Sequence, residues 1–131
     1  MIKIPLFRAA GIAFVFAITG MNAPLYAQSY GTDQSLTMKR DLAGVLGEAH
    51  YIRTLCNGAN DQYWRNYMRD FLKHEGISKE RKSLFTTAFN RGYKFQSERL
   101  FRCDSAVASL EVTLASKGRK MAETLAAQYM Q

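Results

Sequence analysis

Apolar residues recur at spacings of three and four along most of this chain, and this helical periodicity constrains the fold more than any other feature. In a segment from about residue 36 to residue 55 the spacing is followed by Leu42, Val45, Leu46, Ala49, Ile52 and Cys56. Residues spaced in this way lie on one face of a helix. No long alternation of apolar and polar residues, the pattern of a half-buried strand, occurs in the sequence. The sequence therefore predicts an all-α protein.

Three more helices are predicted downstream, each with an apolar stripe. The stripes are Trp64, Tyr67, Met68, Phe71 and Leu72; then Leu84, Phe85, Ala88 and Phe89; then Val107, Leu110, Leu114, Met121 and Leu125. The short connections favour antiparallel neighbours, so we expect a small up-down-up-down, antiparallel four-helix bundle over residues 36–131. Residues 28–35 are polar and are expected to form a flexible tail.

Helix boundaries can also be read from single residues. Caps that accept from free backbone N–H groups are expected at Asn60 or Asp61, at Ser78, and at Asp104 or Ser105. Asn57-Gly58 and Gly76 are typical helix stops. Glycine costs about 1 kcal/mol relative to alanine inside a helix, so a kink or break is expected at Gly92. Gly44 and Gly47, three residues apart, favour close packing of another helix.

The first 27 residues have the three parts of a secretory signal peptide. Lys3 and Arg8 precede an apolar run over residues 9–18, and Ala27 offers a cleavage site, with Ala23 as the alternative. The run is too short to span a bilayer, which needs about 20 apolar residues. We therefore expect cleavage, export to the periplasm, and no transmembrane span in the mature form.

Cleavage would leave a basic domain of 104 residues. It would remove two of the 18 basic residues and none of the 11 acidic ones, which gives a net charge of +5. A positive surface raises the local concentration of anionic partners. After export those partners would be an anionic envelope component or an acidic protein, whereas no nucleic acid is expected.

Cys56 and Cys103 are the only cysteines. In an up-down-up-down bundle the end of the first helix and the connection between the third and fourth lie at the same end. Two thiols exported into an oxidising compartment usually form a disulfide. No CxxC motif or dense Cys/His cluster supports a metal or redox site instead, so we predict one structural disulfide.

Several stretches resemble a family of small exported alphaproteobacterial proteins that is catalogued as a domain of unknown function. The resemblance lies in LGEAHYIRTLCNG at residues 46–58, DQYWR at 61–65, FNRGY at 89–93, FQS at 95–97 and Arg102-Cys103. It covers residues from about 42 to 125. It implies an exported, periplasmic, helical protein and no particular reaction.

No catalytic set, metal site or cofactor site is expected. A histidine beside a carboxylate can act as a general base, but Glu48 and His50 are two residues apart and point away from each other on a helix. A metal site would need three or four converging ligands, and the two histidines, His50 and His74, are expected at opposite ends of the bundle. No nucleophile elbow or phosphate-binding glycine loop is present.

The end of the bundle that carries the disulfide is the candidate binding surface. It gathers polar and basic residues beyond those needed for capping, and a guanidinium group suits a carboxylate or phosphate ligand. The candidate residues are His50, Arg53, Asn57, Asp61, Gln62, Arg65, Gln96, Arg99 and Arg102.

Two hypotheses compete with a non-enzymatic protein that binds an anionic partner at this surface. In the first, the aromatic stripe with Trp64 and Tyr67 faces a cavity that holds a small molecule or lipid. In the second, His50 acts with Arg53 or Glu48 in an enzyme. Oligomeric state does not follow from the sequence.

Overall fold

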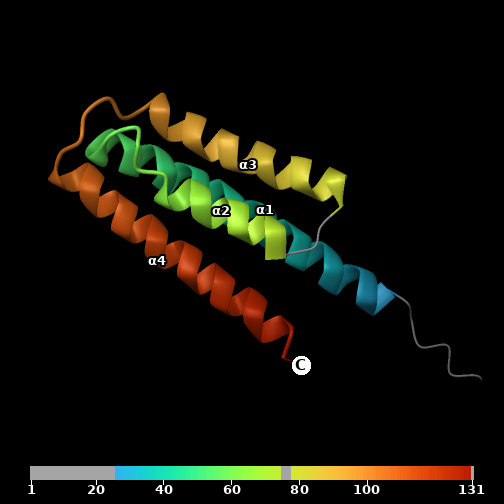
Figure 1. Cartoon of the computed structure of the whole chain (residues 1–131). Helices are drawn as coiled ribbons and strands as arrows, with labels where there is room; N and C mark the ends of the chain where they lie inside the picture. Colours follow the sequence, from blue (N-terminus) through green and yellow to red (C-terminus); the bar gives the residue numbers. More distant parts are fainter. Residues whose placement is uncertain (1–25, 75–77, 131) are drawn as a thin grey trace, which may run out of the picture.

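A computed structural model describes residues 26–74 and 78–130 of the chain, with side chains from residue 34 onward. This part folds into four α-helices and contains no strand (Figure 1). The helices are α1 (Tyr26–Asn57), α2 (Tyr63–His74), α3 (Lys79–Ser97) and α4 (Ser105–Gln128). The prediction of an all-α protein with four helices is confirmed. The signal peptide prediction falls mainly on residues 1–25, outside the described part.

Successive helices run in alternating directions, and α1 lies at the centre of the arrangement (Figure 1). All extensive helix–helix contacts involve α1, which packs most closely against α3, then against α4 and α2. In a regular up-down-up-down bundle α3 would lie diagonally across from α1. Here the parallel pair α1 and α3 has the largest contact, so the neighbours differ from those expected from short connections.

Glycines explain the close approach of α1 and α3. A Cβ atom added to Gly47 would lie 1.9 Å from the backbone oxygen of Phe89, and one added to Gly92 would lie 2.0 Å from the backbone oxygen of Gly44. The helix α3 runs without a break from Lys79 to Ser97. The helix therefore has no break at Gly92, because this glycine provides room for a backbone and does not interrupt its own helix.

The first helix is longer than its apolar stripe. It begins at Tyr26, so residues 28–35, for which a flexible tail was expected, belong to α1. These residues contain no proline and only one glycine, so nothing in them forces the helix to start later. The helix ends as predicted, because Gly58 adopts a φ of +100°, a conformation that favours glycine.

Two of the predicted caps are confirmed. The Ser78 side chain accepts from the backbone N–H of Arg81, and the Asp104 carboxylate accepts from that of Val107 at 2.9 Å. Asp61 is different, because α2 begins two residues later, at Tyr63. Its carboxylate accepts from the Tyr63 N–H at 3.2 Å and also binds side chains of α1. The predicted stop at Gly76 lies outside the described residues.

The core is built around the apolar face of α1. Ile52 and Ala43 are fully enclosed, and Phe85 of α3 is equally inaccessible. Trp64 and Phe71 of α2 are partly buried and pack against this core. The remaining buried apolar side chains are Leu42, Val45, Leu46, Ala49, Met68, Phe89, Val107, Leu114 and Leu125. All nine of these residues belong to the predicted stripes.

The disulfide joins Cys56 and Cys103, as predicted, with their Cα atoms 5.0 Å apart. It ties the end of α1 to the connection between α3 and α4, which lie at the same end of the molecule (Figure 1). Within residues 26–74 and 78–130, no helix is long and apolar enough to cross a membrane.

Candidate functional site

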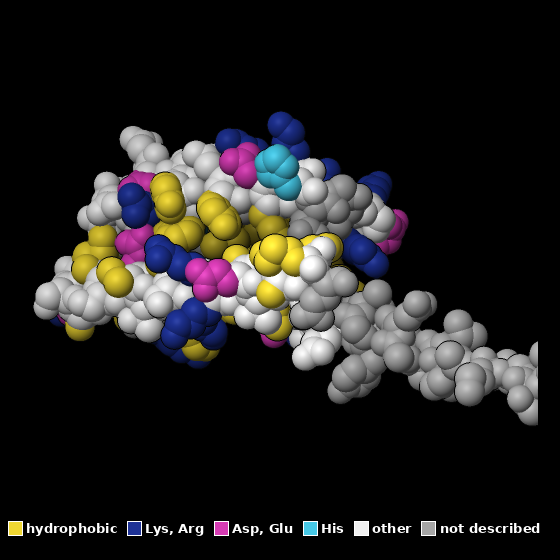
Figure 2. All heavy atoms as spheres, turned by 90° about the horizontal axis from the view of Figure 1, so that it is seen from below, with side chains coloured by type: hydrophobic (Ala, Val, Ile, Leu, Met, Phe, Trp, Pro, Cys, Tyr) yellow, Lys and Arg dark blue, Asp and Glu magenta, His cyan; other side chains and the backbone are white. Residues whose placement is uncertain are grey.

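An apolar groove lies between α2 and α4, and α1 forms its floor. Its volume is about 410 Å³. Figure 2 views the molecule from below, where hydrophobic side chains are visible along a hollow between two ridges. The lining residues are Leu42, Val45, Leu46 and Ala49 of α1, Tyr63, Trp64 and Tyr67 of α2, and Leu114, Ala115, Gly118, Arg119, Ala122, Glu123 and Ala126 of α4.

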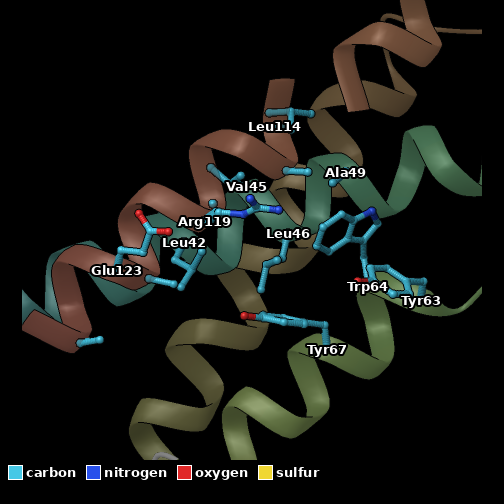
Figure 3. A pocket seen from close by; sticks show the side chains of 14 residues that line it. Leu42, Val45, Leu46, Ala49, Tyr63, Trp64, Tyr67, Leu114, Arg119 and Glu123 are labelled. Carbon is cyan, nitrogen blue, oxygen red and sulfur yellow. The ribbon is translucent and has the colours of Figure 1, made fainter. Parts of the chain in front are cut away.

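Aromatic side chains form the α2 wall of the groove (Figure 3). The Trp64 ring makes edge contacts with Tyr63 and Tyr67, at centroid distances of 4.9 and 6.1 Å. Its indole N–H donates to the Glu111 carboxylate of α4 at 2.8 Å. This bond holds the Trp64 ring in place and ties one end of α2 to α4.

Small residues form the α4 wall and leave the space open. Ala115, Gly118, Ala122 and Ala126 repeat at spacings of three and four, so they share one face of α4. Gly118 is buried above Leu42. Larger side chains at these positions would occupy the volume that the groove now offers.

Two charged side chains of α4 border the groove. Figure 3 shows Arg119 reaching across the groove toward Leu46, whereas Glu123 lies toward Leu42 at one end. Neither makes an ion pair or hydrogen bond with any residue that the structure describes. The groove therefore combines an apolar interior with an available guanidinium group.

Part of the predicted binding surface is an internal network instead. Arg53 donates from Nε to Asp61 at 2.9 Å and from Nη1 to Glu111 at 3.0 Å. Asn57 donates its amide N–H to Asp61 at 2.9 Å. The hydrogen bonds from Asn57 and Arg53 lower the pKa of the Asp61 carboxyl to about 2. These groups satisfy one another and connect α1, the α1–α2 connection and α4.

Other residues of the predicted surface lie apart from this network. Gln96 is buried and donates to Glu48 at 2.6 Å, so the Glu48 carboxylate binds α3 and not His50. Arg99 donates to the carbonyl of Phe95 at 2.6 Å and stacks on its ring. Arg102 is exposed.

The remaining three residues, His50, Gln62 and Arg65, line a common cavity between α2 and α3. His50 is buried, and its ring packs against those of Phe89 and Tyr93. Burial lowers the pKa of His50 below its usual 6.5, and the charge of Arg65 lowers it further, against a weaker opposing effect of Asp61. The structure thus divides the nine predicted residues among a network, a cavity and separate positions.

Sequence reasoning did not identify the α4 side of the apolar groove. The stripe of small residues at positions 115, 118, 122 and 126 is the signal that could have indicated it. The hypothesis of a cavity beside Trp64 and Tyr67 required a void there, and the groove provides one. In the described part of the chain, no three His, Cys, Asp or Glu side chains converge as a metal site would require.

Comparison with known proteins gives one match. The model of a family described as a protein of unknown function, DUF2385, matches residues 33–129. No curated protein and no solved structure matches the chain.

Proposed function

We propose that this chain, which belongs to the DUF2385 family, is an exported, non-enzymatic binding protein that holds the apolar chain of an anionic amphiphile in the groove between α2 and α4. The single observation that carries the proposal is the Arg119 guanidinium, which has no partner among the described residues and extends into a groove lined mostly by apolar side chains. Small-molecule sites are typically apolar hollows with a few polar groups that orient the ligand. An acyl chain with an acidic headgroup has this combination of properties.

The size of the groove supports a small-molecule ligand. Its volume of about 410 Å³ falls within the range of roughly 300–1,000 Å³ that is usual for small-molecule sites. From Leu114 to Ala126 the α4 wall extends for about 18 Å at 1.5 Å per residue. A groove of this length suits a narrow, chain-like ligand.

The net charge of the protein supports an anionic ligand. The whole sequence has a net charge of +7, and the part after residue 27 has +5. Among the described lining residues, Arg119 is the only cation and Glu123 the only anion. Because Glu123 lies at one end, a headgroup that binds Arg119 can extend away from it. Of the anionic partners expected from the sequence, an envelope amphiphile fits this groove better than an acidic protein does.

The proposed location is the periplasm. The pattern of basic residues, apolar run and Ala27 at the start of the sequence supports export. The Cys56–Cys103 disulfide is compatible with an oxidising compartment.

Trp64 permits a direct test because it is the only tryptophan and lines the groove. Dodecanoate, added below its micelle concentration, should change Trp64 fluorescence in a saturable manner. Arg119→Gln should weaken dodecanoate binding about tenfold, since a charge-assisted hydrogen bond is lost. Dodecyltrimethylammonium, which has the same chain and opposite charge, should bind the unchanged protein more weakly than dodecanoate.

A matched pair of variants separates groove binding from adsorption elsewhere. Ala122→Phe fills the groove and should abolish the fluorescence response, whereas Ala108→Phe places the same ring on an exposed part of α4 outside the groove. Equal binding by these two variants, or no saturable response with dodecanoate, would overturn the proposal. Tighter binding of the cationic amphiphile would overturn the assignment of an anionic headgroup.

A further inference from the structure

A second hollow lies on the other side of α2, between α2 and α3. Its volume is about 670 Å³, and α1 contributes His50, Tyr51, Thr54 and Leu55 to its lining. His50 is only 4% exposed, yet its Nδ1 atom is buried without a hydrogen-bond partner among the described residues. Buried polar atoms are normally hydrogen-bonded. Because Nδ1 is enclosed, His50 can contact a molecule in the hollow only through its other ring nitrogen, Nε2.

The state of the imidazole follows from its surroundings. A neutral imidazole has one N–H donor and one acceptor nitrogen. Burial and Arg65 favour the neutral form of His50. If the enclosed Nδ1 is the acceptor, the proton is on Nε2, and His50 can donate a hydrogen bond to a molecule in the hollow.

Arg65 and Asn90 can also donate hydrogen bonds into this hollow. Arg65 has no ion pair or hydrogen bond with a described residue, and Asn90 contributes an amide group, whereas the amide N–H of Gln62 donates to the carbonyl of Ala59 at 2.8 Å. A smaller adjoining hollow of about 310 Å³ shares Arg65 and Asn90 and adds Arg69. No described acidic side chain lines either hollow. The charged side chains that line these two hollows therefore favour an anionic ligand.

The apolar and aromatic lining of the hollow indicates which kind of organic group carries the anionic charge of the ligand. Phe89 and Tyr93 of α3 line the hollow together with Leu55, and the Tyr93 ring lies edge-on to Tyr51 at 5.2 Å. The Tyr51 hydroxyl donates to the carbonyl of Leu100, so its proton is not available to a ligand. Aromatic and apolar walls around a basic group suit an organic anion with a ring or short apolar body.

We propose that the hollow between α2 and α3 is a binding site for a small organic oxyanion, a phosphate ester or carboxylate, held by Arg65, Asn90 and the His50 imidazole. The site is separate from the amphiphile groove, since the two hollows share no lining residue. It does not depend on the function proposed for that groove.

Phenyl phosphate and benzoate are the probes for this site, and benzyl alcohol is the uncharged control. In NMR titrations, at least one of the two anions should shift the His50 imidazole resonances in a saturable manner, and benzyl alcohol should not. A bound anion should also raise the pKa of His50, because it offsets the charge of Arg65. The charged or titratable groups that line the hollow besides His50 are Arg65 of α2, Tyr51 of α1 and Tyr93 of α3.

Two exposed arginines provide the matched variants. Arg65→Gln should weaken binding about tenfold, since the charge-assisted hydrogen bonds are lost. Arg81→Gln removes the same charge from α3 outside the hollow and should have no effect. Equal affinities of these variants, equal shifts with benzyl alcohol, or no saturable shift with either anion at millimolar concentrations would overturn the proposal. All readouts retain His50, so they do not depend on a substitution in the core.

Discussion

Gly44, Gly47 and Gly92 form the contact between α1 and α3, but their surroundings differ. At Gly47 and Gly92 a Cβ atom would lie within 2.0 Å of backbone oxygen on the other helix. At Gly44 the nearest atom, the carbonyl oxygen of Ala88, would be 3.8 Å away, which is an ordinary contact. Two of the three glycines are therefore required by the distance between the helices.

This difference predicts opposite effects of the same substitution one helical turn apart. Gly47→Ala should lower the free energy of unfolding by about 3 kcal/mol, because the backbones of α1 and α3 must separate. Gly44→Ala should leave it unchanged or raise it by up to about 1 kcal/mol, since alanine favours the helix. Urea unfolding followed by circular dichroism measures both. Equal effects of the two substitutions would contradict the proposed contact.

At the scale of the elements, Arg53 of α1 binds two carboxylates, and this network connects three helices. Asp61, just before α2, and Glu111 of α4 both accept from the Arg53 guanidinium of α1, and Glu111 also accepts from Trp64 of α2. The positions of α2 and α4 on α1 are thus fixed at the disulfide end. The same contacts set the α2–α4 separation there, and so the width of the groove.

Acid should weaken this connection in a defined pH range. The pKa of Asp61 is about 2 in the folded protein and 3.8 ordinarily, so the unfolded chain takes up the proton first as pH falls. The stabilisation by Asp61 is complete above about pH 4 and is lost as the pH falls toward 2. Asp61→Asn should be less stable at pH 7 and lose less stability over this range, as measured by urea unfolding.

Asp70→Asn is the control for this measurement, because Asp70 is an exposed carboxylate of α2 outside the network. Its pH profile should follow that of the unchanged protein. An identical profile for Asp61→Asn would mean that Asp61 contributes no acid-sensitive stability.

At the scale of the whole molecule, α1 organises the fold and the disulfide closes it. The other three helices all pack on α1, whereas extensive contacts among α2, α3 and α4 are absent within the described residues. A fold with one central helix leaves hollows between its outer helices. The two proposed sites, on either side of α2, are such hollows.

The disulfide should contribute a large part of the stability of so small a domain. Cys56 and Cys103 are 47 residues apart, and closing a loop of that length stabilises the folded state by about 4 kcal/mol in the chain-entropy model. The double variant Cys56→Ser/Cys103→Ser should lose about this amount in denaturant unfolding. A reducing agent should destabilise the unchanged protein but leave the variant unaffected. Equal stability of the two proteins would contradict a stabilising role of the disulfide.

The sequence by itself determined what depends on neighbours along the chain. Apolar spacing identified four helices, Ser78 and Asp104 identified two helix starts, and Gly58 identified the end of α1. These features depend on local hydrogen bonds and on which side of a helix is apolar. The pairing of Cys56 with Cys103 followed because alternating helix directions bring those two positions to one end.

Only the tertiary structure decided which surfaces face one another. In an isolated helix, glycine is less favourable than alanine. In this fold, Gly92 allows the backbone of α1 to approach α3 closely. Arg53 and Arg65 have the same chemistry in the sequence, but Arg53 is neutralised by Asp61 and Glu111, whereas Arg65 borders a hollow. The groove beside Trp64 likewise depends on how far α4 lies from α2. Distances between residues remote in the chain are set by packing, and a local pattern does not specify them.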